Sequence, residues 1–347
     1  MNATEFGDAM ISFRGASKTY PDGTVAVHPL DLEVREGEVC VLVGESGCGK
    51  TTTMRMINRL QEPTTGVVEV GGRDVMTVPL KELRLGMGYV IQQIGLFPHL
   101  TVRKNVATVC NLLKWDKQKT NDRVDEMLEL VGLPPGEFAN RYPHQLSGGQ
   151  RQRVGVARAL AADPPVLLMD EPFGAIDPIA RNRLQDEFLA LQARVRKTVV
   201  IVTHDIDEAV KLGDRIAVMR SGGYLDQYAA PAEVLGDPAT PFVAEFTGSD
   251  RSLKLLAVTP VESGELEPFT PADRDLPSVP ANYSLRESLA VLLDSKRGKV
   301  TVGDPANPHG VLTMDGIRRA LRITTADVAA EHAVDHAVDQ AVNGGPD

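Results

Sequence analysis

Three short runs of apolar residues give the first view of the fold. Val39–Val43, Val166–Met169 and Val199–Val202 are continuously apolar rather than alternating. Strands of a parallel sheet are covered on both faces and show this pattern. Because β-rich runs alternate with helical stretches from residue 11 to about residue 245, we predict one α/β domain over 11–245.

The segments between these runs predict helices and a hairpin. We expect a helix over Thr52–Leu60, and the pattern is helical between roughly Thr120 and Leu160. Arg215–Tyr228 is typical of two strands joined by a tight turn at residues 221–223, where two glycines follow a serine.

The composition changes after Asp250. Five prolines fall within residues 251–280, which predicts a linker or an irregular lead-in over 246–278. Residues 279–323 then have the pattern of a small second module. The acidic tail, 324–347, repeats a four-residue unit as HAVD, HAVD and QAVN, and we expect it to be disordered.

Charge and cysteine content narrow the class of protein. Lys plus Arg is 37 and Asp plus Glu is 47, a net charge of -10, which disfavours nucleic-acid binding because phosphate contacts need a basic surface. Three sparse cysteines (Cys40, Cys48 and Cys110) predict neither disulfides nor a zinc site and fit a reducing cytosol.

The chain shows no signal for the membrane itself. Its first ten residues lack the basic and apolar regions of a signal peptide, and no run approaches the ~20 apolar residues that span a bilayer. If this protein moves solutes, another chain must supply the pore.

A phosphate-binding loop follows the first apolar run. GESGCGKT, residues 44–51, fits the pattern G-x-x-x-x-G-K-[ST] between a strand and a helix. Its glycines let successive backbone N–H groups point inward at anionic oxygens. Lys50 can reach the β- and γ-phosphates, and the Thr51 hydroxyl can hold Mg²⁺. We interpret Cys48 as a small filler within this loop.

Two acids end the second apolar run. In VLLMDEP, Asp170 and Glu171 follow a buried strand, where a Walker B carboxylate belongs. Asp170 is predicted to bind Mg²⁺, and Glu171 to polarise the attacking water as general base. Adjacent side chains on a strand point in opposite directions, so the two acids can have separate roles.

The segment LSGGQ, Leu146–Gln150, precedes a helical run with Ser147 as the expected N-cap. A hydroxyl, two glycine N–H groups and a helix dipole make an anion site. Because the domain already has one phosphate loop, this second anion site predicts a second phosphate-bearing partner.

With these motifs, residues 11–245 resemble the ABC ATPase family. The resemblance implies a RecA-like core, an antiparallel β subdomain and a helical signature subdomain at about 100–160. It also implies a head-to-tail homodimer in which each ATP lies between the P-loop of one copy and the LSGGQ of the other. Four further positions match family motifs: Tyr20 stacking on adenine, Gln92 in the Q-loop, Asp177 in the D-loop and His204 as the switch histidine.

The motifs and the resemblance together assign the site. Catalysis is assigned to Glu171, His204 and Lys50, and the cofactors are ATP and Mg²⁺. The expected Mg²⁺ ligands are Thr51, Gln92 and Asp170. The expected ATP contacts are Tyr20, Gly44, Glu45, Ser46, Gly47, Cys48, Gly49, Lys50, Thr51, Thr52, Gln92, Ser147, Gly148, Gly149, Gln150 and Asp177.

The resemblance narrows to an importer class. LFPHLTVRKNV and TTTMRMINRLQEPTTG resemble ATPases that energise uptake of glycine betaine, choline and carnitine. This implies a separate membrane permease, indirectly a substrate-binding protein, and a peripheral place on the cytoplasmic face of the membrane. Alternatives are an importer for amino acids or sugars, and a non-transport ABC ATPase.

The second module, Val279–Leu321, resembles a CBS motif, which osmoprotectant ATPases often carry. CBS motifs normally come in pairs, and only one is legible here; 246–278 would hold a degenerate first copy. Nucleotide sensing and a dimerisation or regulatory role that binds nothing small are both open. The module is locally basic beside the acidic tail, and this charge contrast suggests an ionic-strength sensor, although two solvated faces is the favoured interpretation.

Overall fold

The computed structural model describes residues 8–91, 95–174, 176–263, 266–305 and 307–321. These residues form two compact units. The first reaches from residue 8 to Val234 and includes Pro238–Phe246, and the second holds Leu235–Asp237 and residues 247–321. Within the described ranges, no helix has the length and apolar character to cross a bilayer.

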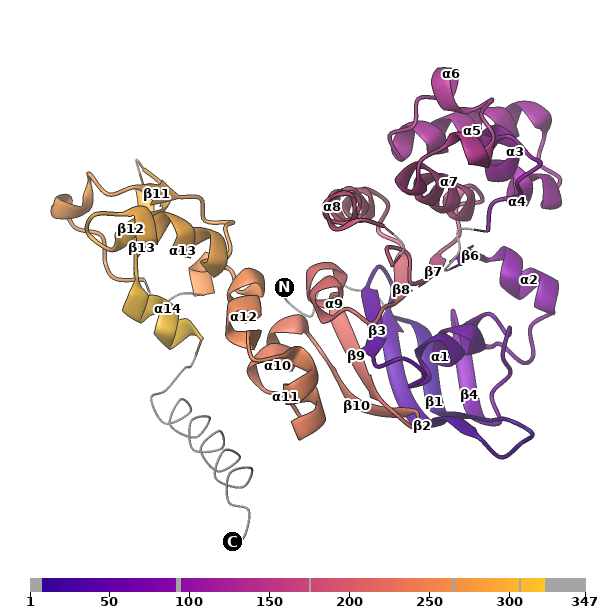
Figure 1. Cartoon of the computed structure of the whole chain (residues 1–347), viewed down its shortest axis with the longest axis horizontal. Coiled ribbons are helices and arrows are strands. Elements are labelled where there is room, and N and C mark those ends of the chain that lie inside the picture. Colours follow the sequence, from indigo (N-terminus) through magenta and orange to yellow (C-terminus); the bar gives the residue numbers. More distant parts are fainter. Residues whose placement is uncertain (1–7, 92–94, 175, 264–265, 306, 322–347) are drawn as a thin grey trace, which may run out of the picture. The chain divides into compact units, whose positions relative to one another are not determined.

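A six-stranded sheet with the order β10-β9-β3-β8-β7-β6 forms the centre of the first unit (Figure 1). Only β10 runs antiparallel to its neighbour. All residues of β3, β7 and β8 are buried, which explains their continuous apolar runs and confirms the three predicted strands. The strands are β3 (Val39–Gly44), β6 (Met87–Val90), β7 (Val166–Asp170), β8 (Thr198–Val202), β9 (Arg215–Arg220) and β10 (Tyr224–Ala229).

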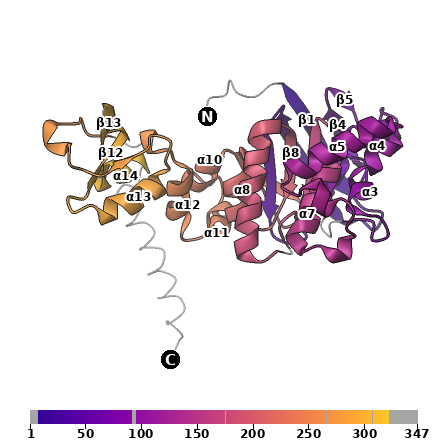
Figure 2. The same cartoon turned by 90° about the horizontal axis from the view of Figure 1, so that it is seen from above.

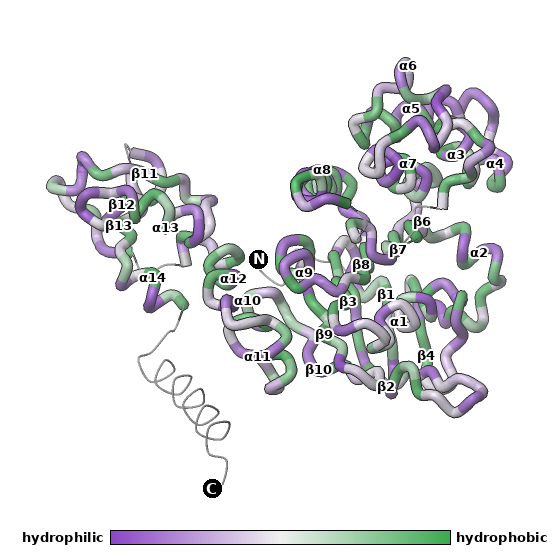
Figure 3. Tube along the Cα trace, in the orientation of Figure 1, coloured by the Kyte–Doolittle hydropathy of each residue, from purple (hydrophilic) through white to green (hydrophobic). Residues whose placement is uncertain are grey.

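A second, antiparallel sheet has the order β2-β1-β4-β5. One apolar cluster joins it to the central sheet and to helix α1 (Lys50–Ile57), with Phe13, Leu42 and Met54 among its buried members. Figure 3 shows the hydrophobic colouring along β3 and β9 that belongs to this core. The strands are β1 (Ala9–Thr19), β2 (Val25–Arg35), β4 (Thr65–Val70) and β5 (Arg73–Asp74).

A group of helices forms a separate region of the first unit. Figures 1 and 2 show α3 to α7 gathered together beyond β6 and β7, with α8 running beside α7 in both views. This is the helical subdomain that the family resemblance implies. The helices of this group are α3 (Val102–Val106), α4 (Thr108–Leu112), α5 (Lys117–Leu130), α6 (Pro135–Phe138) and α7 (Gly148–Leu160). In the sequence, α2 (Leu80–Leu85) precedes the group and α8 (Pro178–Val195) follows it.

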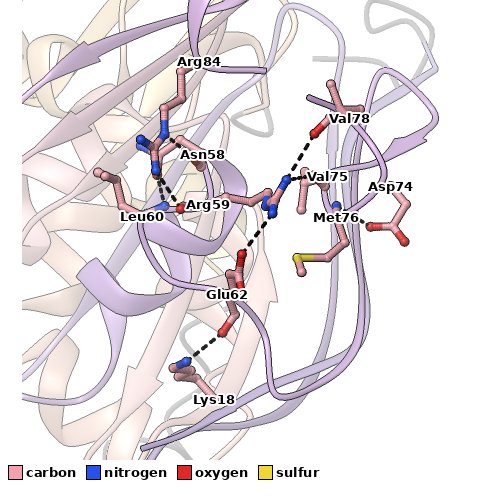
Figure 4. A network of polar contacts seen from close by, with 10 residues as sticks. All are labelled: Lys18, Asn58, Arg59, Leu60, Glu62, Asp74, Val75, Met76, Val78 and Arg84. Atoms are coloured by element: carbon pink, nitrogen blue, oxygen red, sulfur yellow. Dashed lines mark hydrogen bonds and ion pairs between the residues drawn. The ribbon is translucent and has the colours of Figure 1, made fainter. Parts of the chain in front are cut away.

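Two arginines fasten the end of α1. Arg59 adopts φ 52° and donates to the carbonyl oxygens of Val75 (3.2 Å) and Val78 (3.1 Å). Arg84 of α2 donates to the carbonyls of Asn58 (3.1 Å) and Arg59 (2.8 Å). Figure 4 shows these bonds converging on the turn after α1. The helix therefore ends three residues before the predicted Leu60, because the backbone after Ile57 is held by other groups.

The predicted hairpin is confirmed. β9 and β10 pair antiparallel, and Gly222 and Gly223 turn the chain with φ of 90° and 84°. Such angles suit glycine because it has no Cβ. Three more helices flank this hairpin in sequence: α9 (Ile206–Leu212), α10 (Pro231–Gly236) and α11 (Pro241–Thr247).

The second unit is a three-stranded sheet, β11-β12-β13, with its own apolar core. One feature differs from the sequence prediction. Residues 251–258 form helix α12 where we expected a linker or an irregular lead-in, because the first of the five prolines is Pro260. The tail falls outside the described residues. The elements are α12 (Arg251–Val258), β11 (Ser278–Val279), α13 (Leu285–Asp294), β12 (Lys299–Asp304), β13 (Asn307–Thr313) and α14 (Met314–Ala320).

Candidate functional site

The loop between β3 and α1 folds around a lysine ammonium. Lys50 is 6% exposed, and its Nζ donates to the carbonyl oxygens of Gly44 (2.8 Å) and Glu45 (2.7 Å). Helix α1 begins at Lys50, so its N-terminal N–H groups open into the same loop. A cation and unsatisfied donors thus face one concave segment, which is the arrangement that binds phosphate. Of the remaining predicted loop residues, Glu45, Ser46 and Gly47 are exposed.

Two glycines of this loop are required by close backbone contacts. A Cβ on Gly44 would lie 2.0 Å from the carbonyl oxygen of Met219 on β9, and one on Gly49 would lie 2.4 Å from the carbonyl of Ala26 on β2. Both glycines also have positive φ. The loop is therefore wedged between two strands, and its curl is fixed by neighbours as well as by sequence.

Cys48 belongs to the apolar cluster of the two sheets. It is fully buried, and burial raises the pKa of its thiol, an effect that the neighbouring Lys50 opposes. A buried neutral thiol is a poor nucleophile. These features fit the interpretation of Cys48 as a small filler.

The hydroxyl of Thr51 and the carboxylate of Asp170 meet at the end of β7. Thr51 Oγ1 donates to Asp170 Oδ1 at 3.0 Å, and Asp170 is 2% exposed. Arg55, one turn further along α1, lies 3.4 Å from Asp170 Oδ2. A hydroxyl and a carboxylate oxygen beside a phosphate loop are the ligand types that Mg²⁺ accepts, with water and phosphate completing its shell.

Glu171 leaves the strand in a different direction from Asp170. Its backbone adopts φ 45°, and its N–H donates to the carbonyl of Val202 at the end of β8 (2.9 Å). This turn brings Glu171 Oε1 to 3.5 Å from Nδ1 of His204. The predicted base and the predicted switch histidine, 33 positions apart, therefore meet at the carboxyl ends of two adjacent parallel strands.

Ser147 caps α7 as predicted. Its hydroxyl accepts from the Gln150 N–H (3.2 Å) while the Gln150 side chain accepts from the Ser147 N–H (2.9 Å). Ser147 is exposed, and a Cβ on Gly148 would meet nothing closer than 4.0 Å. Within the described part of the chain, no hydrogen bond or ion pair joins residues 146–150 to residues 44–51. The two anion sites are separate features of one copy.

The other predicted residues have varied settings. Tyr20 is half-buried, with its ring 5.6 Å from Lys18 Nζ. Asp177 caps α8 by accepting from the Ala180 N–H at 3.0 Å. Gln92 lies outside the described residues, but Gly95 just after it accepts from the Arg158 guanidinium of α7 at 2.7 Å.

Sequence reasoning missed several polar neighbours of the site. Arg55 was detectable, because its position four residues after Thr51 places both on one face of α1. Thr203 and Glu208 on either side of His204, and Arg181 on α8, belong to no motif. Their contacts depend on how α8 and α9 pack, which spacing alone does not give.

The pattern of the ABC transporter family matches residues 27–174. The osmoprotectant import ATP-binding protein of Salmonella typhimurium is 49% identical over 279 residues, which is 80% of this chain and 71% of that protein. The glycine betaine/carnitine/choline transport ATP-binding protein of Bacillus subtilis is 52% identical over 245 residues, 71% of this chain. That match spans 64% of the length of the Bacillus protein.

Solved structures share the fold. A subunit of the ABC transporter complex cbiONQ from Clostridium perfringens superposes with a TM-score of 0.62 at 27% identity, covering 67% of this chain and 92% of that one. A dimeric ATP-binding cassette in a post-hydrolysis state, bound to ADP and Pi, has a TM-score of 0.57 at 34% identity, covering 64% and 99%.

The parallel sheet, the glycine loop around Lys50 and the paired acids at the end of β7 define a P-loop nucleotide-binding protein. The LSGGQ segment that caps α7 is not a general feature of P-loop proteins. Its presence therefore narrows the class to which this chain can belong. Taken with the relatives above, it shows that this chain belongs to the ATP-binding subunits of ABC transporters.

Proposed function

We propose that this chain hydrolyses ATP, with Glu171 as the base that activates water. The observation that carries the proposal is the approach of Glu171 Oε1 to His204 Nδ1, at 3.5 Å, beside the phosphate loop. Glu171 accepts a proton from the attacking water, and His204 orients the carboxylate and stabilises charge on the γ-phosphate side. Lys50 neutralises the β- and γ-phosphates.

Mg²⁺ is proposed as the second cofactor. Thr51 and Asp170 would hold it, together with Gln92, which lies outside the described residues. The 3.0 Å hydrogen bond between Thr51 and Asp170 supports this assignment because it brings two oxygen ligands to one point. When bound, the ion neutralises the phosphates and favours departure of ADP.

We propose that the active form is a head-to-tail homodimer. One copy carries its phosphate loop and its Ser147–Gln150 segment, of which Ser147 is exposed, as separate sites, so each needs a partner. Pairing two copies completes both sites at once. The post-hydrolysis cassette of similar fold is dimeric, which supports this proposal.

The transported solutes are proposed to be quaternary-amine osmoprotectants. This rests on the functions of similar proteins, which include glycine betaine, carnitine and choline transport. A separate permease, a substrate-binding protein and a peripheral position on the cytoplasmic face of the membrane belong to the same proposal. A spermidine/putrescine import ATP-binding protein from Thermobifida fusca is 48% identical over 256 residues, so a different importer is the second candidate.

We further propose the division into an ATPase domain at 11–245, a connecting segment at 246–278 and a CBS-like module at 279–323. An apolar core within β11, β12, β13, α13 and α14 supports a module, and Leu256 and Val261 of the connecting segment pack into the same core.

The Glu171→Gln variant tests hydrolysis. The substitution keeps size and hydrogen bonding but removes the base, so turnover should fall at least ~10³-fold while ATP still binds and holds a dimer. Phosphate release and size-exclusion chromatography measure the two properties. Full turnover in this variant would refute the assignment of the base.

Uptake assays test the substrate. Cells carrying wild type or Glu171→Gln are compared for uptake of labelled glycine betaine, choline and carnitine at high osmolarity. Loss of one uptake in the variant identifies the solute. Unchanged uptake of all three, with loss of polyamine uptake, would favour the second candidate.

A further inference from the structure

A buried carboxylate lies one helical turn beyond the switch histidine. Glu208 of α9 is 5% exposed, and both of its oxygens are occupied. The Thr203 hydroxyl donates to Oε2, and the Gln185 side-chain amide of α8 donates to Oε1 at 3.3 Å. Thr203 immediately precedes His204, and its N–H also donates to the carbonyl of Leu42 in β3 (3.1 Å). The backbone just before His204 is therefore fixed through Glu208 to α8.

The residue after His204 is fixed to the same helix. Arg181 of α8 lies with one guanidinium nitrogen 3.5 Å from Asp205 Oδ2, and the other donates to the carbonyl of Ile176 at 3.3 Å. Asp205 in turn caps α9, since its Oδ1 accepts from the N–H groups of Asp207 (2.9 Å) and Glu208. Arg181 thus bridges the segment before α8 and the segment that holds His204.

The charges of Glu208, Asp205 and Arg181 also favour the contacts between α8 and the segment that holds His204. Burial raises the pKa of Glu208, Asp205 adds to that rise, and the hydrogen bonds from Thr203 and Gln185 and the charge of Arg181 oppose it. The Arg181 guanidinium is the cation that faces both carboxylates. Removing its charge leaves two acids close together without compensation, and their repulsion acts on the loop that carries His204.

Helix α8 connects this cluster to the predicted D-loop. The helix begins at its N-cap Asp177, next to the Ile176 carbonyl that Arg181 holds. Arg181 and Gln185 are four residues apart and lie on one face. The two anchors of the His204 segment therefore belong to one helix that starts at Asp177.

We propose that Arg181 and Glu208 are positioning residues for hydrolysis: through their contacts with Asp205 and Thr203 they hold His204 beside Glu171. This rests on the roles proposed above for Glu171 and His204.

The variants are Arg181→Gln, which removes the cation, and Glu208→Gln, which keeps the size and removes the charge. Arg183→Gln is the matched control, because Arg183 lies on the same helix, is 75% exposed and pairs with Glu187 instead. We expect kcat to fall about tenfold or more in both variants, with KM for ATP within about twofold of wild type. Arg181→Lys keeps a cation beside Asp205 and should recover part of kcat.

A second readout does not use activity. The imidazole NMR signal of His204, identified by its loss in His204→Ala, should shift in Arg181→Gln and Glu208→Gln but not in Arg183→Gln. ATP-dependent dimerisation, measured by size exclusion in the Glu171→Gln background, should be retained in all three.

Three outcomes would overturn the proposal. Unchanged kcat in both variants means that the cluster does not position His204. A rise in KM or a loss of dimers in step with kcat means a structural role. An unchanged NMR chemical shift of the His204 imidazole in both variants means that the contacts of Arg181 and Glu208 do not affect the histidine. The base assignment fails separately, because it is judged by turnover of the Glu171→Gln single variant.

Discussion

Adding a Cβ at Gly44 and at Gly47 should lower the free energy of unfolding by different amounts. Both have positive φ, but a Cβ on Gly44 would lie 2.0 Å from a β9 carbonyl, whereas one on Gly47 would meet nothing within 4 Å. We expect Gly47→Ala to lose about 1–2 kcal/mol through backbone strain alone. Gly44→Ala should lose a further ~1–3 kcal/mol because the loop or β9 must shift.

Urea unfolding without nucleotide measures the difference between these two variants. The m-values should match wild type if only the folded state is strained. Equal losses for the two substitutions would mean that the loop relaxes away from Met219 freely. In that case the close approach of loop and strand is not a constraint.

The buried carboxyl group of Glu38 should make the stability of the fold depend on pH. Burial raises the pKa of this carboxyl, although the Arg35 N–H donates to it at 2.7 Å and favours the charged form. The folded state therefore holds the proton more tightly than the unfolded chain, so stability is lost as pH rises from the ordinary carboxyl pKa through the raised one. Glu38→Gln should remove this loss and keep an acceptor for Arg35.

Melting temperatures of wild type and Glu38→Gln at pH 4 and pH 7 check the sign. The melting temperature of the variant, relative to that of wild type, should rise as pH increases. Glu36→Gln, two positions earlier and exposed, should show no such trend. If the melting temperature of Glu38→Gln falls relative to wild type between pH 4 and pH 7, the hydrogen bond from Arg35 lowers the pKa of Glu38 by more than burial raises it.

At the scale of elements, we predicted the fully buried strands of the central sheet and missed the strands of the antiparallel sheet. The continuous apolar runs of β3, β7 and β8 follow directly from burial on both faces. By contrast, β1 is interrupted by register shifts between Phe13 and Ala16, around Gly15 with φ 57°, which breaks the alternation that identifies a strand. β2, in contrast, alternates between buried and exposed residues from Leu30 to Arg35, so its signal was present in the sequence and was missed.

Helix ends were predictable only where a side chain forms the cap. Ser147 was identified because serine is a strong N-cap residue. The start of α1 was placed two residues late, because its N-cap is Gly49 in a left-handed conformation with no side-chain hydrogen bond. A cap made by backbone geometry leaves little signal in sequence.

Two serine caps with the same geometry separate stability from function. Ser147 and Ser284 each form a capping box, with Gln150 and Glu287. Replacing either serine with alanine should cost about 1 kcal/mol. Only Ser147→Ala should also weaken ATP-dependent dimerisation, because Ser147 is part of the proposed anion site. Size exclusion with ATP in the Glu171→Gln background measures this. Equal dimerisation of the two variants would contradict that role.

Among the described residues, one apolar cluster joins the two sheets of the first unit and another lies within the second unit. We expect two calorimetric transitions. The proposed ATP site lies in the first unit, so saturating Mg-ATP with the Glu171→Gln variant should raise the transition of that unit, by about 2.7 kcal/mol at 100 times Kd, and leave the other in place. A single transition that shifts as a whole would mean one cooperative unit.

The chemistry of the site was more predictable than its geometry. Lys50, Thr51, Asp170 and Glu171 were identified from motifs whose residue types follow from phosphate and metal chemistry. The contacts of Arg181, Gln185 and Glu208 were not, because they arise where two helices of the folded chain pack. The separation of the two anion sites was expected from sequence, since a single domain needs only one phosphate loop.

The left-handed backbone at Glu171 has a consequence for how this gene would change under relaxed selection. A non-glycine residue at φ 45° costs the folded state about 1–2 kcal/mol, whereas glycine or asparagine bears that angle more easily. In a population that no longer uses the transporter but still keeps the protein abundant, position 171 should drift toward glycine or asparagine before the buried core changes.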